Sequence, residues 1–185
     1  EREVSPDHPE SNYRMVREAL IDRVDIPEVN IHRIEAELGA DEAATRYESE
    51  LARLFDESPP RFDLVWLGMG DDGHTASLFP GTGAVELTDR NVAATYTRSE
   101  VSRAEEVGTT YAAGNSVRRV SLTLPVLNAA RDVMVLVAGD DKASMLQRVM
   151  GTEQPTPDLP VSMVRPVDGT VRWFVDRAAA GQLGQ

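Results

Sequence analysis

The sequence contains no cysteine, so it can form neither a disulfide framework nor a zinc site with thiolate ligands. It also lacks any run of about 18 apolar residues, the length that a membrane-spanning helix needs. Basic side chains are few, because 19 of them face 31 acidic ones and give a formal net charge of −12. Such a charge repels nucleic acid and anionic membrane surfaces, so neither is an expected partner.

Lysine is almost missing from the chain. Of the 19 basic residues, only Lys142 is a lysine and all the others are arginines. The base composition of the coding sequence explains this bias as well as selection does, so the pattern marks Lys142 without giving it a role. The first residues lack the basic-then-apolar order of a signal peptide, and the cytoplasm is therefore the default compartment that we expect.

The length and composition set the number of domains that we expect. The 185 residues are 41% hydrophobic and 27% charged. This is enough to bury one sizeable core and too little for a second complete domain. We therefore expect one domain over residues 1–185.

Helical and extended patterns alternate along the chain. Helices are predicted over 13–22, with Ser11 as the cap and Met15, Ala19 and Leu20 as an apolar face, and over 41–55, 141–150 and 176–180; strands are predicted over 62–67, 91–96, 119–124, 132–138 and 171–175. The first and fourth strands are continuous apolar runs, which is typical of strands buried on both faces. Strand followed by helix, repeated, predicts an α/β fold with a mostly parallel sheet and helices on both faces. The polar segment 97–116, which contains glycine, is predicted to be a loop beside a site.

The glycine-rich segment Gly68-Met-Gly-Asp-Asp-Gly73 follows a predicted strand and matches the dinucleotide-binding pattern G-x-G-x-x-G. Two features count against that interpretation. Asp71 and Asp72 would place carboxylates beside a pyrophosphate, and Pro80-Gly81 would end the following helix too early. No second strand ends in an acidic residue at the expected distance either. We therefore rank dinucleotide binding below a catalytic turn.

His74 directly follows this turn, at the carboxyl end of a predicted strand, where ligands bind in open α/β sheets. An imidazole has an ordinary pKa of about 6.5, which suits proton transfer at neutral pH. Asp72, two residues earlier, is placed to orient the imidazole or to stabilise its charge. The alternative is that His74 only caps a short helix or binds a carbonyl group. Its position after Asp72-Gly73 favours a functional role.

The segment Leu67–Pro80, LGMGDDGHTASLFP, resembles the signature of 6-phosphogluconolactonases. Further segments resemble those of the same family in the same order. These are Glu1-Arg2 with Ser11-Asn12, Arg119–Pro125, Ala138–Lys142 and Trp173–Ala179. The resemblance covers the whole chain, and it implies a three-layer fold shared with aminosugar-phosphate isomerases.

The resemblance implies an activity, the hydrolysis of 6-phosphoglucono-1,5-lactone to 6-phosphogluconate in the oxidative pentose phosphate pathway. His74 would take a proton from the attacking water, with Asp72 beside it, and nearby backbone N–H groups would hold the oxyanion. Gly70 and Gly73 are also expected among the substrate-binding residues. No metal or organic cofactor is required, because an ester carbonyl is already electrophilic. The expected partner is a small phosphorylated sugar lactone, and the sequence makes no prediction of oligomeric state.

The phosphate of such a substrate needs local cations on an acidic protein. Lys142 is expected at a helix N-terminus after a strand, and Arg119 offers a planar guanidinium to phosphate oxygens. For Arg119 the alternative is an ordinary surface ion pair. Arg2 and Asn12 resemble family positions that line the site. These four residues are the predicted ligands of the phosphorylated substrate.

Two alternatives remain within the same fold. The related isomerases carry a carboxylate shortly after the histidine, and Phe79 stands at that position here. Phenylalanine cannot transfer protons, which favours the hydrolase. Family members also begin with an additional region, roughly the first third of their length, that carries a phosphate-binding loop. Because this sequence opens after that region, we expect an N-terminally incomplete member, and a non-catalytic sugar-phosphate-binding remnant is the alternative function.

Overall fold

The computed structural model describes residues 1–56, 58–97 and 118–184 of the chain. Its α-helices and strands are α1 (Asn12–Ala19), α2 (Ala40–Leu54), β1 (Leu64–Gly68), β2 (Val92–Thr95), β3 (Arg119–Leu122), α4 (Leu124–Ala129), β4 (Asp132–Val137), α5 (Ala143–Met150) and β5 (Thr170–Val175). The predicted loop over 97–116 lies outside the described residues, apart from Thr97. Within the described parts, no helix has the length and apolar character to cross a lipid bilayer.

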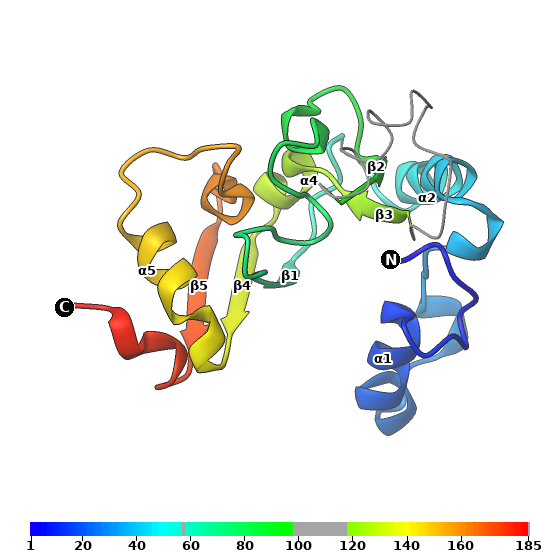
Figure 1. The fold of residues 1–185 in the computed structure, drawn as a ribbon. Helices are drawn as coiled ribbons and strands as arrows, with labels where there is room; N and C mark the ends of the chain where they lie inside the picture. Colours follow the sequence, from blue (N-terminus) through cyan, green and yellow to red (C-terminus); the bar gives the residue numbers. More distant parts are fainter. Residues whose placement is uncertain (57, 98–117, 185) are drawn as a thin grey trace, which may run out of the picture.

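The strands β1, β4 and β5 form a parallel sheet with β4 in the centre (Figure 1). Val65 pairs with Val133, and Val133 pairs with Val171 on its other side. Such β-branched side chains pack well on a pleated surface and favour strands. The predicted α/β class with a parallel sheet is confirmed. Because parallel strands end at one edge of the sheet, the segments that follow β1 and β4 are neighbours there.

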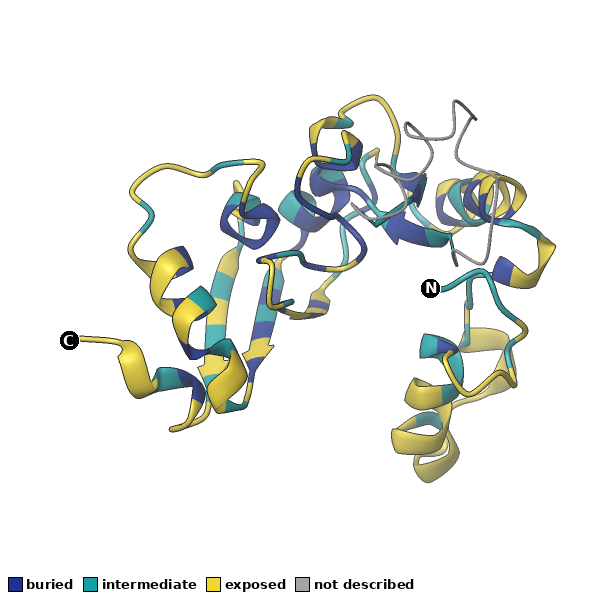
Figure 2. Cartoon of the chain, viewed as in Figure 1, coloured by how far each residue is buried: buried dark blue, intermediate teal, exposed yellow. Residues whose placement is uncertain are grey.

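The two faces of this sheet differ in burial. On one face Val133 and Val135 are fully buried in the larger hydrophobic core, to which α4 and α5 contribute. On the other face Trp66 is 60% exposed, Leu136 51% and Phe174 50% (Figure 2). The prediction that β1 and β4 are buried on both faces is therefore wrong. Their residues alternate between buried and more exposed positions, because α4 and α5 add to the core on one face only.

A second, smaller core lies between α2 and the antiparallel pair of β2 and β3. Ala40, Ala43 and Leu51 are buried on one face of α2, at the spacing of an amphipathic helix. Phe62 and Leu122 pack against both cores and join them. The antiparallel pair is thus held beside the parallel sheet, which decides where the side chains of β3 lie.

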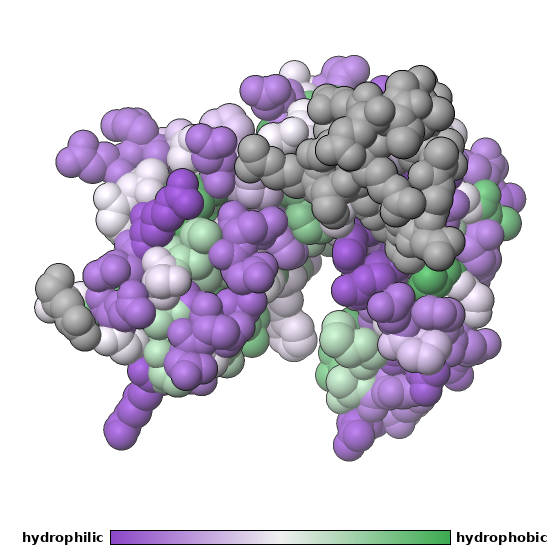
Figure 3. Space-filling model, in the orientation of Figure 1, coloured by the Kyte–Doolittle hydropathy of each residue, from purple (hydrophilic) through white to green (hydrophobic). Residues whose placement is uncertain are grey.

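The helix α1 begins where the sequence predicts. Ser11 accepts a hydrogen bond from the Arg14 N–H at 3.1 Å and caps the helix. The predicted apolar face is present but is not packed, since no residue of α1 is buried and Met15 is 60% exposed. Apolar atoms gather over α1 beside a deep notch in the surface (Figure 3). The helix is therefore placed by its N-terminal end and not by a core.

Candidate active site

The site begins at the turn that follows β1. The Gly70 N–H donates to the His74 carbonyl at 2.9 Å, and the Gly73 N–H donates to the Gly70 carbonyl at 3.2 Å. Gly73 has a φ of 83°, in the left-handed region that favours glycine, and a Cβ at Gly70 would overlap the His74 imidazole. Both N–H groups are used inside the turn. Gly70 and Gly73 therefore shape the site, and the substrate contacts expected of them are not available through these two donors.

No helix follows the turn. The Thr75 hydroxyl donates to the Gly68 carbonyl at 2.8 Å, and the Leu78 N–H donates to the Thr75 carbonyl at 2.9 Å. Ala76, between them, has a φ of 49°. The short helix expected after His74 is therefore replaced by a second tight turn. A pyrophosphate would lack the helix N-terminus that dinucleotide binding requires, which agrees with the low rank of that alternative.

The imidazole of His74 is held by Asp72. The distance from His74 Nδ1 to Asp72 Oδ1 is 2.6 Å, and the same oxygen accepts the His74 backbone N–H at 3.0 Å. Partial burial raises the pKa of Asp72, but the backbone N–H and the imidazole of His74 together lower it below its ordinary value of 3.8. An ionised carboxylate only accepts hydrogen bonds, so Nδ1 carries the proton of the neutral imidazole. Nε2 is left as the basic nitrogen.

The ring of Phe79 connects this pair to β3. Its centroid lies 4.5 Å from that of His74, with 42° between the ring planes, and the Arg119 guanidinium carbon lies 5.3 Å from the Phe79 centroid. The Ser77 N–H also donates to Ser121 Oγ at 3.1 Å, which ties the same segment to β3. In the sequence, Phe79 is notable only because it stands where the related isomerases have a carboxylate. Its contact with Arg119 cannot be predicted, because no spacing pattern marks residues 79 and 119 as neighbours.

Three of the predicted binding residues, Arg2, Asn12 and Arg119, come together where the first segment of the chain pairs with the start of β3. Arg2 faces Arg119 across an antiparallel bridge, and residues that face each other in this way project to the same side. Arg2 Nη1 donates to Asn12 Oδ1 at 2.6 Å and to the Glu10 carbonyl at 2.9 Å. We call Arg2, Asn12 and Arg119 the arginine group. The bridge brings two arginines together on one side of the backbone, which adds positive charge to one region of an otherwise acidic protein.

Two acidic residues fix the first segment of the chain against its neighbours. The Glu1 carboxylate accepts the first two backbone N–H groups of α1, from Asn12 at 2.8 Å and from the next residue at 2.7 Å. The Glu3 carboxylate accepts from Arg118 Nε at 2.6 Å, and Arg118 Nη1 donates to Asp41 at 2.6 Å. The hydrogen bond to Glu3 is the main cause that raises the pKa of Arg118. These contacts hold the backbone of Arg2, which lies between Glu1 and Glu3, in place.

Lys142 lies after β4, at the same edge of the parallel sheet as the turn after β1. It ends a short 3-10 turn directly before α5, so the predicted position at a helix start after a strand is confirmed. Its ammonium nitrogen lies 3.4 Å from the Asp141 carboxylate. The turn packs against this helix, because a Cβ at Gly73 would come within 3.4 Å of Met145 Sδ. The structure thus brings Lys142 to the sheet edge of His74, whereas the arginine group lies around Arg119 at the start of β3.

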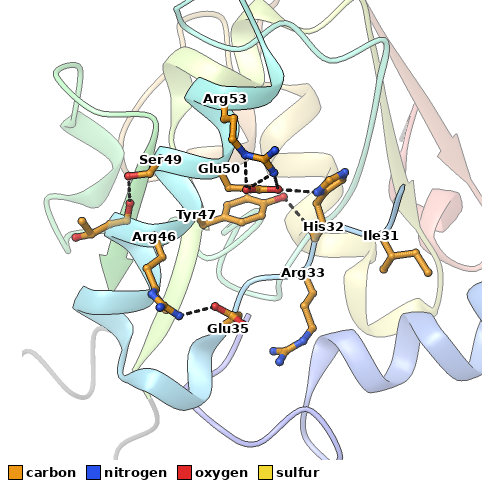
Figure 4. A pocket seen from close by; sticks show the side chains of 11 residues that line it. Ile31, His32, Arg33, Glu35, Arg46, Tyr47, Ser49, Glu50 and Arg53 are labelled. Atoms are coloured by element: carbon orange, nitrogen blue, oxygen red, sulfur yellow. Dashed lines mark hydrogen bonds and ion pairs between the residues drawn. The ribbon is translucent and has the colours of Figure 1, made fainter. Parts of the chain in front are cut away.

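A hollow of about 670 Å³ lies elsewhere, between α2 and the segment before it (Figure 4). Its arginines each bond a carboxylate: Arg33 with Glu37, Arg46 with Glu35, and Arg53 with Glu50. These cations are already neutralised, so an anionic substrate would gain little there. In residues 1–56, 58–97 and 118–184, no group of three or more His, Cys, Asp or Glu side chains is arranged to hold a metal ion.

Known proteins resemble this chain along almost its whole length. Residues 1–173 match the family model described as glucosamine-6-phosphate isomerases/6-phosphogluconolactonase. The 6-phosphogluconolactonase of Synechocystis sp. is 39% identical over 187 residues, which cover 99% of this chain and 70% of that protein. The human 6-phosphogluconolactonase is 40% identical over 184 residues, which cover 99% of this chain and 66% of that protein.

Solved structures give the same result. The structure of 6-phosphogluconolactonase from Trypanosoma brucei aligns with a TM-score of 0.79 and 28% identity, covering 100% of this chain and 72% of that one. The chain is thus shorter than the relatives it matches, and it is homologous to 6-phosphogluconolactonases over its whole length. The predicted family is confirmed: the chain belongs to the glucosamine-6-phosphate isomerases and 6-phosphogluconolactonases.

Proposed function

We propose that this chain hydrolyses 6-phospho-D-glucono-1,5-lactone to 6-phospho-D-gluconate, with His74 as the general base. The observation that carries the proposal is the 2.6 Å contact between Asp72 Oδ1 and His74 Nδ1. This contact keeps the proton on Nδ1 and leaves the lone pair on Nε2, in a side chain that is 30% exposed. A basic nitrogen that water can reach is what lactone hydrolysis requires.

The reaction follows from that arrangement. Nε2 takes a proton from a water molecule while the water oxygen attacks the lactone carbonyl carbon. The carbonyl π electrons move to its oxygen and give a tetrahedral oxyanion, and the resulting imidazolium is stabilised by the ionised carboxylate of Asp72. The carbonyl then re-forms, the bond to the ring oxygen breaks, and the ring oxygen leaves with the proton from Nε2. His74 returns to its neutral form and needs no further group to balance the protons.

The arginine group is the proposed seat of the substrate's phosphate. Guanidinium groups bind phosphate oxygens through paired, charge-assisted hydrogen bonds, and the backbones of Arg2 and Arg119 pair across a bridge that puts their side chains on the same side. Asn12 orients Arg2 through the 2.6 Å hydrogen bond to its guanidinium. Lys142, at the sheet edge of His74, supplies a further cation near the reacting end. The phosphate and the carbonyl are thus assigned to different parts of the site.

A second candidate function is the binding of a sugar phosphate without turnover. One support is length, since the chain spans 66% of the human relative. The other is that the arginine group takes no residue from the turn that carries His74, so it can bind a phosphate independently of catalysis. An isomerase is less well supported, because the ring of Phe79 lies against His74 where a proton-transferring carboxylate would be needed. Hydrolysis remains the function that the geometry favours.

The test is the variant His74→Ala, assayed for lactone hydrolysis above the spontaneous rate. We expect kcat to fall by about 10² to 10⁴-fold, the range of a general base. Binding of 6-phosphogluconate, measured by calorimetry, should persist because the arginine group is intact. His8→Ala is the matched control, since the His8 ring is exposed and accepts the Glu10 N–H in a turn of its own. Unchanged hydrolysis in His74→Ala would rule out the role, and wild-type binding without turnover would favour the second candidate.

A further inference from the structure

Phe79 is a buried aromatic residue that contacts two polar side chains of the site. It is only 5% exposed, yet it is in neither of the two clusters of buried apolar side chains among the described residues. Its neighbour Leu78 is fully buried in the larger core. The ring of Phe79 instead contacts the imidazole of His74 and the guanidinium of Arg119. Burial alone therefore does not explain why an aromatic ring stands here.

The ring has a definite physical effect on each of its two contacts. The face of an aromatic ring carries partial negative charge and attracts a guanidinium above it. The ring of Phe79 also covers the imidazole of His74 from one side, while Asp72 Oδ1 holds Nδ1 at 2.6 Å. Rotation of the imidazole is thus restricted, and Nε2 points in one direction. The guanidinium of Arg119 is restricted in the same way, because it lies over the ring at 5.3 Å from the centroid.

We propose that Phe79 is a positioning residue that sets the spacing between Nε2 of His74 and the guanidinium of Arg119. The inference rests on the proposed function, in which these groups serve the carbonyl and the phosphate of one substrate. A fixed spacing selects lactones whose phosphate lies at a matching distance from the carbonyl. Phe79 therefore determines how much the phosphate of the substrate accelerates hydrolysis, although it touches neither reacting atom.

The experiment compares two substrates, 6-phosphoglucono-1,5-lactone and glucono-1,5-lactone, which lacks the phosphate. Phe79→Leu removes the ring but keeps an apolar side chain of similar volume, and Phe79→Tyr keeps the ring. We expect Phe79→Leu to lower kcat/KM for the phosphorylated lactone by about 10 to 100-fold, the cost of a small misplacement. The loss of kcat/KM for glucono-1,5-lactone should be clearly smaller. Phe79→Tyr should retain most of the wild-type difference in kcat/KM between the two substrates.

Leu78→Val is the matched control, because it trims the core next to Phe79 without touching His74 or Arg119. It should lower the melting temperature and leave the ratio of the two kcat/KM values unchanged. Equal losses for both substrates in Phe79→Leu would overturn the proposal, as would a change of the ratio in Leu78→Val. Calorimetry with 6-phosphogluconate and gluconate gives a second measurement that needs no turnover. If the difference in affinity between 6-phosphogluconate and gluconate is the same in the wild type and in Phe79→Leu, the proposal is also overturned. The general base is tested separately, since an active His74→Ala variant would refute it.

Discussion

The two halves of the site are built in different ways. The proton-transfer half consists of Gly70, Asp72 and His74, which lie within one turn and are joined by hydrogen bonds inside that turn. The arginine group takes Arg2, Asn12 and Arg119 from separate segments of the chain. The first half is assembled within a few residues of the end of β1, whereas the second depends on the register of the first residues against β3.

This difference indicates which half is more easily disturbed from a distance. The turn is closed by its own backbone and packed against α5 through Gly73. The arginine group depends on Glu1 at the start of α1 and on Glu3 with Arg118, so its geometry is set by contacts outside the group. Substitutions in the turn should therefore affect the chemical step, and substitutions in the arginine group should affect binding.

The largest effect is expected from Gly70→Ala. The added Cβ would occupy the place of the His74 imidazole, which would have to move away from Asp72. We expect kcat to fall by about 10² to 10⁴-fold, as though the base were removed, with little change in melting temperature because a side-chain end gives way. Gly68→Ala is the matched control, since nothing lies within 4 Å of its added Cβ. Similar activity of the two variants would contradict the crowding that we infer at Gly70.

A smaller effect, of a different kind, is expected from Arg2→Gln. This change removes one charge from the arginine group, and hydrogen bonds to charged groups contribute about 1.5–3 kcal/mol. We expect KM to rise by about 10 to 100-fold with kcat nearly unchanged, because Arg2 is assigned to the phosphate and not to the carbonyl. Steady-state kinetics on both variants would show the contrast with Gly70→Ala. Arg14→Gln serves as the control, since its guanidinium bonds Glu18 on the surface; a fall in kcat for Arg2→Gln would erase the distinction between the halves.

The same difference explains how far the site could be predicted from the sequence. Asp72 and His74 stand two residues apart after a predicted strand, so local geometry was enough to suggest their pairing. The meeting of Arg2 with Arg119 was predicted only through resemblance, because strand register between distant segments is not visible in one sequence. The contact of Phe79 with Arg119 was missed for the same reason. That the N–H groups of Gly70 and Gly73 bond within the turn is not visible in the sequence, because hydrogen bonds within a turn depend on its closure.

The fold was predicted in the same uneven manner. The strands and helices were found close to their observed positions, since apolar runs, glycines and prolines mark them locally. The burial of β1 and β4 was predicted wrongly, because an apolar run does not say whether a partner covers each face; Trp66 and Leu136 are exposed. Met15 lies on the predicted apolar face of α1 and is also exposed. Apolar residues mark a surface that can be buried, and tertiary packing decides whether it is.

The smallest effect should come from Asp72→Asn, measured as stability against pH. Folding lowers the pKa of Asp72 below 3.8, so its ionised form favours the folded state. This stabilisation is fully present above pH 3.8 and is lost as the pH falls through the lowered value. Because the side chain is 45% exposed, solvent screening should keep the contribution below about 1 kcal/mol. Urea unfolding at pH 7 and at pH 3 measures it: the wild type should exceed Asp72→Asn slightly at pH 7, and the gap should narrow at pH 3. A gap at pH 3 that is as large as the gap at pH 7 would contradict the lowered pKa of Asp72, and the local half of the site would then lack the charge that orients its base.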